Sequence, residues 1–267
     1  PLAMTALYSL SDYDAIKPLA WVGLGNYSRL MADDRFWVAV KNTLYFTVTS
    51  VPARLALALF LAMLLSLKVR GQAVYRTVFF LPTIVPLVVS AVLWMWVFNA
   101  QSGLLNGALQ QIGIDNPPGW LADRAWAKPA LVLMSLWGIG GSMVIFLAGL
   151  ADVPQSLYEV ADLDGAGPLS KFRHVTLPMI SPVILFNLVI GLINGFQYFT
   201  EVYVMTNGRG DPADSTLFYA LYLYRTAFYY LQLGYASAMA WIMFVVILGA
   251  TLAVLASSKR WVHYHAD

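Results

Sequence analysis

Residues 151–182 bring acidic, glycine and proline residues together inside a strongly apolar chain, and read ADVPQSLYEVADLDGAGPLSKFRHVTLPMISP. Motifs that would catalyse a reaction are missing. The chain has no G-x-x-x-x-G-K-[ST] phosphate loop, no H-E-x-x-H zinc motif and no G-x-S-x-G nucleophile motif. It also has no cysteine, which excludes disulfides, zinc–thiolate sites and a cysteine nucleophile. We therefore expect no catalytic residue, no metal and no cofactor, and interpret the segment as a surface for contact with another protein.

The local sequence of this segment predicts a helix–turn–helix knob. Pro154 suits a first helical turn, where its missing N–H costs nothing, and two turns can follow to Leu163. Asp164-Gly165 should end the helix, because glycine readily adopts a positive φ. A second short helix is expected over about residues 169–174. The knob would display apolar side chains around an acidic flank, namely Leu157, Tyr158, Ala161 and Leu163 with Glu159 and Asp162.

The elements that must position this knob are membrane-spanning helices. Hydrophobic residues make up 60% of the 267 residues and charged residues only 11%, whereas a soluble chain has about 25% charge. A bilayer core needs about 20 apolar residues in a helix, and backbone groups in lipid must be satisfied within the segment. We predict an all-α, polytopic transmembrane bundle over 1–267, with complete spans near 38–66, 77–98, 128–150, 177–205 and 230–257. Residues 1–10 would be the end of a truncated first span.

The fifth run, 177–205, contains the most polar side chains of any predicted span. Asn187, Asn194, Gln197 and Glu201 should share one broad helical face. Amides and aromatic rings suit a sugar, which needs donors and acceptors for its hydroxyls and flat surfaces for its C–H faces. Interhelical hydrogen bonding is an equally weighted alternative. The predicted substrate pathway consists of Asn187, Asn194, Gln197, Tyr198, Glu201 and Trp137.

Small and aromatic residues suggest two further features. Gly191 and Gly195 form a GxxxG pair, which favours close helix approach over ligand contact. The outer loop, 99–127, mixes turn residues with tryptophans. Two interpretations of this loop remain open: an aromatic belt at the lipid headgroups, or a docking surface for an external partner.

The 151–182 segment resembles the EAA loop of ABC importer permeases. The resemblance depends on Glu159, Ala161, Asp164-Gly165-Ala166, Phe172, Leu177-Pro178 and Pro182. Val160 stands where the family usually has a second alanine. Further stretches resemble the carbohydrate-type branch, which includes maltose and glycerol-3-phosphate permeases: VGLGNY at 22–27, FFLP at 79–82, FLAGL at 146–150 and GYASA at 234–238.

This resemblance implies a function and a set of partners. Residues 151–176 would be a cytoplasmic coupling loop that contacts an ATPase subunit. The chain would form half of a sugar pathway that works by alternating access, in a bacterial or archaeal inner membrane. Its partners would be a second permease, two ATPase subunits that bind the ATP, and an external solute-binding protein. Scattered basic residues argue against nucleic acid. The coupling residues implied are Leu157, Tyr158, Glu159, Ala161, Asp162, Asp164, Gly165 and Ala166.

One rival class explains the spans equally well. A secondary transporter or channel that works without an ATPase would also need apolar helices and a polar fifth run. It would give the 151–182 pattern no purpose. Recovery of a soluble ATPase together with the chain would distinguish the two classes.

Overall fold

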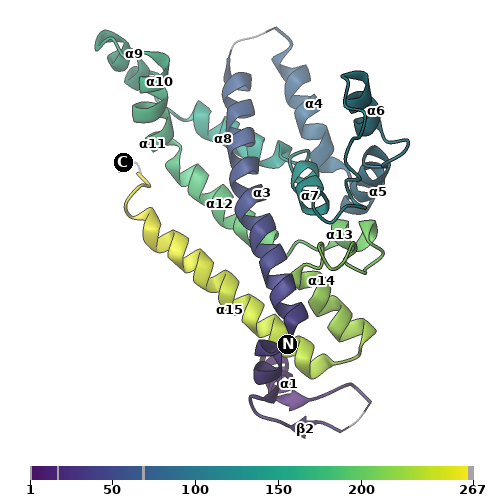
Figure 1. The fold of residues 1–267 in the computed structure, drawn as a ribbon. Coiled ribbons are helices and arrows are strands. Elements are labelled where there is room, and N and C mark those ends of the chain that lie inside the picture. The colour runs from purple at the N-terminus through teal and green to yellow at the C-terminus, as the bar shows by residue number, and fades with distance from the viewer. Residues whose placement is uncertain (1, 17, 68–69, 264–267) are drawn as a thin grey trace. The chain divides into compact units, whose positions relative to one another are not determined.

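The computed structural model describes residues 2–16, 18–67 and 70–263, and most of these residues are helical (Figure 1). The predicted all-α class is confirmed, apart from one antiparallel pair of two-residue strands in which Ser11 pairs with Trp21. The elements are α1 (Leu2–Ser9), β1 (Ser11–Asp12), β2 (Ala20–Trp21), α2 (Gly25–Met31), α3 (Asp34–Ser66), α4 (Gln72–Ile84), α5 (Leu87–Val97), α6 (Leu104–Gln111), α7 (Ala127–Ser135), α8 (Gly140–Ala151), α9 (Gln155–Leu163), α10 (Pro168–Lys171), η1 (Phe172–Thr176), α11 (Leu177–Met179), α12 (Ser181–Phe196), α13 (Thr200–Met205), α14 (Tyr219–Tyr224), η2 (Arg225–Tyr229) and α15 (Leu233–Ser258).

Three of the five predicted spans are not single helices. Within the described ranges, three stretches are long and apolar enough to cross a membrane: Asp34–Ser66, Ser181–Met205 and Leu233–Ser258. The number rises to five if α4 with α5, and α7 with α8, each count as one broken span. The 77–98 run breaks because Pro86 disfavours helical geometry at the preceding residue, and Val85 is extended with φ −68° and ψ 126°.

The chain divides into two compact units. Unit 1 comprises Pro1–Thr49, Pro86–Met134 and Ile193–Gly249, and unit 2 comprises Ser50–Val85, Ser135–Leu192 and Ala250–Asp267. Each unit has its own buried core. In unit 1 the fully buried large side chains include Phe36 and Phe46 of α3, with Phe218, Leu221 and Met239.

The core of unit 2 packs α3 against α8. Ala58, Ala62 and Leu65 of α3 are buried with Met143 and Phe146 of α8. Small residues on one helix and large ones on the other let the two backbones approach, as is common between membrane helices.

Glycines mark the closest helix contacts, as predicted for the GxxxG pair. Within unit 2, a Cβ atom on Gly191 would lie 3.0 Å from Val51, and one on Gly140 would lie 2.7 Å from the carbonyl oxygen of Phe79. Within unit 1, a Cβ on Gly195 would lie 3.0 Å from Thr47. Glycine thus lets α12 pack closely against α3 at residues 191 and 195, because a side chain there would require the neighbouring Val51 or Thr47 to shift.

Candidate functional site

Helix α9 forms the first half of the candidate coupling loop and has the bounds predicted from the sequence. It begins at Gln155, with Pro154 immediately before it rather than within the first turn. The helix ends in a Schellman motif. The N–H of Ala166 donates to the carbonyl of Ala161 at 2.9 Å, and the N–H of Gly165 donates to Asp162 at 3.0 Å. Gly165 has φ +73°, as its type predicts, and this left-handed residue reverses the chain.

The second half of the loop is more continuous than predicted. The expected helix over 169–174 begins with α10 at Pro168 and continues through the π-helix η1 and then α11 to Met179. A π-helix adds a residue to the ordinary turn and often occurs at functional sites. The loop is therefore joined to the start of α12 by nearly unbroken helical backbone, and α9 and α10 together form a projecting hairpin (Figure 1).

Exposed side chains make α9 a contact surface rather than a packed connector. Leu163 is 89% exposed, Leu157 is 39% exposed, and Glu159 also lies on the surface. Ala161 and Ala166 are half-buried, whereas Asp164 and Gly165 are exposed. Isolated exposed apolar side chains are ordinary. Exposed apolar and acidic side chains together on a closed helical hairpin are suited to binding another protein.

Two of the predicted coupling residues also make contacts within the loop itself. The Tyr158 hydroxyl lies 2.9 Å from the Thr176 hydroxyl and is half-buried, so this ring is not displayed as expected. Asp162 forms an ion pair with Lys171. The Asp162 side chain nevertheless stays 61% exposed, so the acidic flank at α9 consists of Glu159 and the lysine-paired Asp162.

The structure has no single continuous helix that contains the four polar residues predicted to share one face, namely Asn187, Asn194, Gln197 and Glu201. Helix α12 ends at Phe196, and α13 begins only at Thr200, after Phe199 with φ −142° and ψ −59°. The helical repeat of 3.6 residues is therefore interrupted between Asn187 and Glu201, and it cannot be used to place these residues on one face. The prediction was wrong because it treated an apolar run as one uninterrupted helix.

The individual pathway residues have distinct environments. In unit 2, Asn187 is buried and donates to the Val183 carbonyl at 3.0 Å, which favours a structural role. Trp137, half-buried, lies in the interruption between α7 and α8. In unit 1, Asn194 and Gln197 are exposed. Tyr198 is stacked on Phe46 with ring centroids 4.1 Å apart, and Glu201 is half-buried in the first turn of α13.

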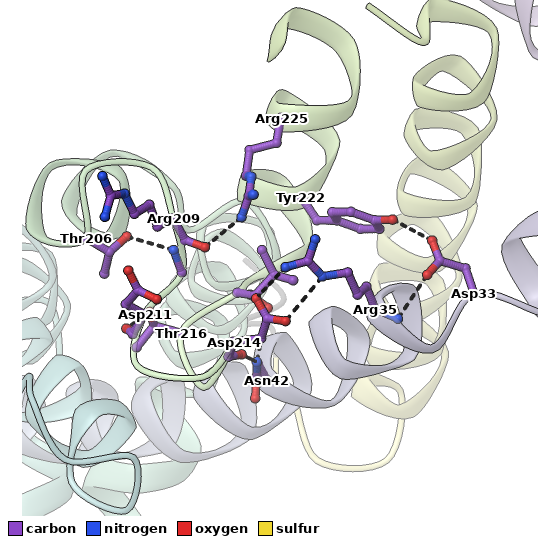
Figure 2. A network of polar contacts seen from close by, with 12 residues as sticks. Asp33, Arg35, Asn42, Thr206, Arg209, Asp211, Asp214, Thr216, Tyr222 and Arg225 are labelled. Carbon is purple, nitrogen blue, oxygen red and sulfur yellow. Dashed lines mark hydrogen bonds and ion pairs between the residues drawn. The ribbon is translucent and has the colours of Figure 1, made fainter. Parts of the chain in front are cut away.

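A polar cluster in unit 1 was not predicted from the sequence, although a buried amide in an apolar run is a recognisable signal. Asn42 is buried in α3 and donates to the carbonyls of Asp214 at 2.8 Å and Leu217 at 3.1 Å. Its own oxygen accepts from Lys128 at 3.0 Å. Arg35 forms a two-pronged contact with the Asp214 carboxylate, at 3.1 and 3.2 Å (Figure 2).

Asp33 extends this cluster. Its carboxylate accepts from the hydroxyls of Tyr222 at 2.5 Å and Tyr235 at 2.7 Å. Burial raises the pKa of Asp33, but these hydroxyls and the N–H groups of Arg35 and Phe36 together hold it below its usual value. Burial, and then the hydrogen bond to Asp33, raise the pKa of Tyr222. We name Asp33, Arg35, Asn42, Asp214 and Tyr222 the Asp33–Asp214 cluster.

The outer loop, 99–127, folds around one buried tryptophan. Trp120 donates its indole N–H to Asn106 of α6 at 2.6 Å, and Asn106 in turn donates to the carbonyls of Ala100 and Pro118. A pocket of about 340 Å³ opens beside this structure. Its lining combines apolar side chains with two amides: Met95, Phe98, Asn99, Ala100, Gln101, Gly119, Leu121, Ala122 and Met205.

Comparisons with known proteins agree with this arrangement. A family model described as "Binding-protein-dependent transport system inner membrane component" matches residues 38–263. A probable ABC transporter permease protein of Bacillus subtilis, YesP, is 40% identical over 100% of this chain and 86% of that protein. The lactose transport system permease protein LacF of Rhizobium radiobacter is 38% identical over 89% of this chain and 80% of that protein.

A solved structure supports the same fold. The crystal structure of a bacterial alginate ABC transporter, in complex with an alginate pentasaccharide-bound periplasmic protein, contains a chain that matches with a TM-score of 0.79 and 25% identity. The match covers 89% of this chain and 83% of that chain. The resemblance inferred from residues 151–182 is thereby confirmed.

Proposed function

Because the chain belongs to the family of inner-membrane components of binding-protein-dependent transport systems, we propose that it forms half of the pathway through which an ATP-driven importer moves a sugar or sugar-like solute. The observation that best supports this proposal is the hairpin of α9 and α10, which presents Glu159 and two exposed leucines on a rigid, capped helix. A transporter without an ATPase has no use for this surface.

The loop transmits movement because it is rigid and continuous with a span. When an ATPase subunit moves, it pushes on the side chains of α9. The helical backbone transmits this movement through η1 and α11 into α12. Tyr158 and Asp162 keep the hairpin closed, and Leu157, Glu159, Ala161, Asp164, Gly165 and Ala166 form the coupling surface. Rigid-body movement of this kind switches the pathway between its two openings.

The chain needs partners for every other step. Two ATPase subunits bind and hydrolyse the ATP, a second permease completes the pathway, and an external solute-binding protein delivers the solute. The outer loop with its Trp120–Asn106 anchor and adjacent pocket is the proposed docking surface for the solute-binding protein.

A sugar is the solute that the exposed amides suit best. Asn194 and Gln197 lie on the surface of unit 1 next to the stacked ring of Tyr198, and amides both donate to and accept from hydroxyls. LacF is described as a lactose permease, and the alginate transporter imports a polysaccharide. Glu201 and Trp137 complete the proposed pathway, whereas Asn187 is assigned to packing because its amide is bonded within α12.

The coupling proposal is tested by co-purification. Membrane-extracted wild-type protein should recover an ATPase and a second permease. Glu159→Lys should recover much less ATPase while the second permease remains. Asp115→Lys is the matched control, because it makes the same charge reversal at an exposed residue far outside residues 151–176 and should recover ATPase normally. Failure of the wild-type protein to recover any ATPase would favour an autonomous transporter.

The substrate-pathway proposal is tested by uptake. Asn194→Leu should lower sugar uptake several-fold, because a hydroxyl partner is lost, and should leave ATPase recovery unchanged. The control Thr77→Val removes an exposed hydroxyl that bonds within α4 and should have no effect. Unchanged uptake kinetics for Asn194→Leu would remove this amide from the pathway.

A further inference from the structure

Four aromatic rings in unit 1 form a second, separate grouping beyond the proposed pathway. Phe199 precedes α13, Tyr203 lies within it, Tyr224 ends α14, and Phe228 lies in the π-helix η2. Neighbouring ring centroids are 5.0 to 5.4 Å apart. The rings are tilted or edge-on to one another, so parts of their faces stay uncovered. We call these four residues the aromatic cluster.

The aromatic cluster is open, in contrast to the rings of the core. Phe228 is 66% exposed and Tyr203 is 38% exposed, whereas Phe46 and Phe218 in the same unit are almost fully buried. The turn that follows α13 packs closely on Tyr203: a Cβ on Gly208, which has φ +71°, would lie 2.9 Å from this ring. The surface is therefore held in place but not covered by the described part of the chain.

A charged side chain directly follows Tyr224 of the aromatic cluster and argues against hydrocarbon at this position. The Arg225 guanidinium donates to the Arg209 carbonyl at 2.6 Å and to the Tyr230 hydroxyl at 2.8 Å (Figure 2 draws the first of these). A charged group is costly in a bilayer core, so this region lies at the aqueous or headgroup level. Tyr203 and Tyr224 carry hydroxyls beside their apolar faces, and a hydrogen bond between the two side chains raises the pKa of Tyr224.

The aromatic cluster is continuous in sequence with the exposed amides of the proposed pathway. Gln197 lies two residues before Phe199 in the interruption between α12 and α13. Aromatic faces cover the apolar C–H surfaces of sugar rings, while amides and hydroxyls bond the sugar hydroxyls. The residues next to one another along 197–203 thus offer both kinds of contact in succession.

We propose that Phe199, Tyr203, Tyr224 and Phe228 form an entry surface on which the sugar rings of an oligosaccharide stack before they reach Gln197 and Asn194. This inference rests on the proposed function, because it extends the same pathway outward. An aromatic belt against lipid headgroups is the competing explanation for the exposed rings.

The chain's lack of cysteine permits a direct test. Phe228→Cys is introduced into the transporter with all its subunits, in right-side-out membrane vesicles. The rate of labelling by a membrane-impermeant maleimide is then measured with and without millimolar lactose, arabinotriose or alginate trisaccharide. We expect labelling from the aqueous side, slowed several-fold by at least one of these sugars. The control Ile16→Cys is also highly exposed, lies outside the outer loop, and should label at the same rate with and without sugar.

Two results would overturn the inference. Lack of labelling from water would place the rings against lipid. Labelling that none of the sugars slows would show that the surface does not bind them. Neither result affects the ATPase co-purification with Glu159→Lys, so failure of this inference is distinguishable from failure of the proposed function.

A substitution series adds an independent readout. Tyr224→Ala should raise the KM for uptake several-fold with little change in the maximal rate, because it removes a ring that binds the sugar on entry. Tyr224→Phe keeps the ring and should recover most of the affinity. Equal uptake by wild type and Tyr224→Ala would contradict the inference.

Discussion

The coupling loop and the Asp33–Asp214 cluster are similarly polar in sequence but use their polar groups in opposite ways. In the cluster, Asn42 forms three hydrogen bonds and Asp33 accepts from two tyrosines. In the loop, Glu159 is exposed beside exposed leucines. The role of a polar residue in a membrane protein therefore depends on the hydrogen bonds it makes. Polar side chains whose hydrogen bonds are made within the protein stabilise the fold, whereas exposed polar side chains are available to a partner.

The largest expected effect is on the loop, where Gly165→Pro should abolish uptake. Proline fixes φ near −65°, whereas Gly165 needs +73° and donates its N–H to Asp162. The turn between α9 and α10 therefore cannot form. The measurement is sugar uptake, with membrane insertion checked separately.

A matched control lies two residues away. Gly167 has φ −69° and open space around its Cβ position, so Gly167→Pro makes the same substitution at a compatible backbone. It should transport normally. If Gly165→Pro also transported normally, the loop would not be the rigid coupling element described here.

The second largest expected effect is a loss of stability when the Asp33–Asp214 cluster is disrupted. Asn42→Leu leaves two buried carbonyls without their donor and Lys128 without its acceptor, which should cost about 3 kcal/mol of unfolding free energy. Thermal unfolding in detergent measures it. Thr49→Val on the same helix, where the hydroxyl bonds only its own helix, should change stability by less than about 0.5 kcal/mol. Equal melting of both variants would mean that the cluster does not hold the fold.

The smallest effect is inside the loop, at its internal hydrogen bond. Tyr158→Phe removes the hydroxyl that bonds Thr176 and should destabilise the closed hairpin by about 1 kcal/mol. Amide hydrogen exchange over 155–163 should become faster, with uptake only slightly reduced. Tyr75→Phe, at an exposed tyrosine, is the control. Unchanged exchange would indicate that Lys171 and the Gly165 turn suffice to close the loop.

Local features of the loop could be predicted from sequence alone. The bounds of α9 and the positive φ of Gly165 follow from the intrinsic preferences of residues within one turn. The Tyr158–Thr176 bond could not be predicted, because it joins residues from two different helices of the hairpin. Sequence spacing gives no information on which side chain turns inward.

The positions of the apolar runs were predicted better than their helical form. Hydropathy detects length, and the five apolar runs correspond to three candidate spans and two broken pairs in the described residues. It does not detect a break inside an apolar run, such as the one at residues 197–199. The pathway amides were therefore found by their type, but their supposed common face was wrong. The Asn42 contacts depend on the distant segment 214–217 and were missed.

The π-helix at the base of the loop has a consequence for how this region tolerates length changes. Five residues, Phe172–Thr176, occupy a widened turn between α10 and α11. Because a widened turn contains about one residue more than an α-helical turn, loss of one residue there would restore an ordinary turn and leave the docking face of α9 pointing in nearly the same direction. Loss of one residue from an ordinary helix such as α12 would instead rotate everything before it by about 100° about the helix axis. The widened turn is therefore the place in this region where the helical backbone can absorb a change in length.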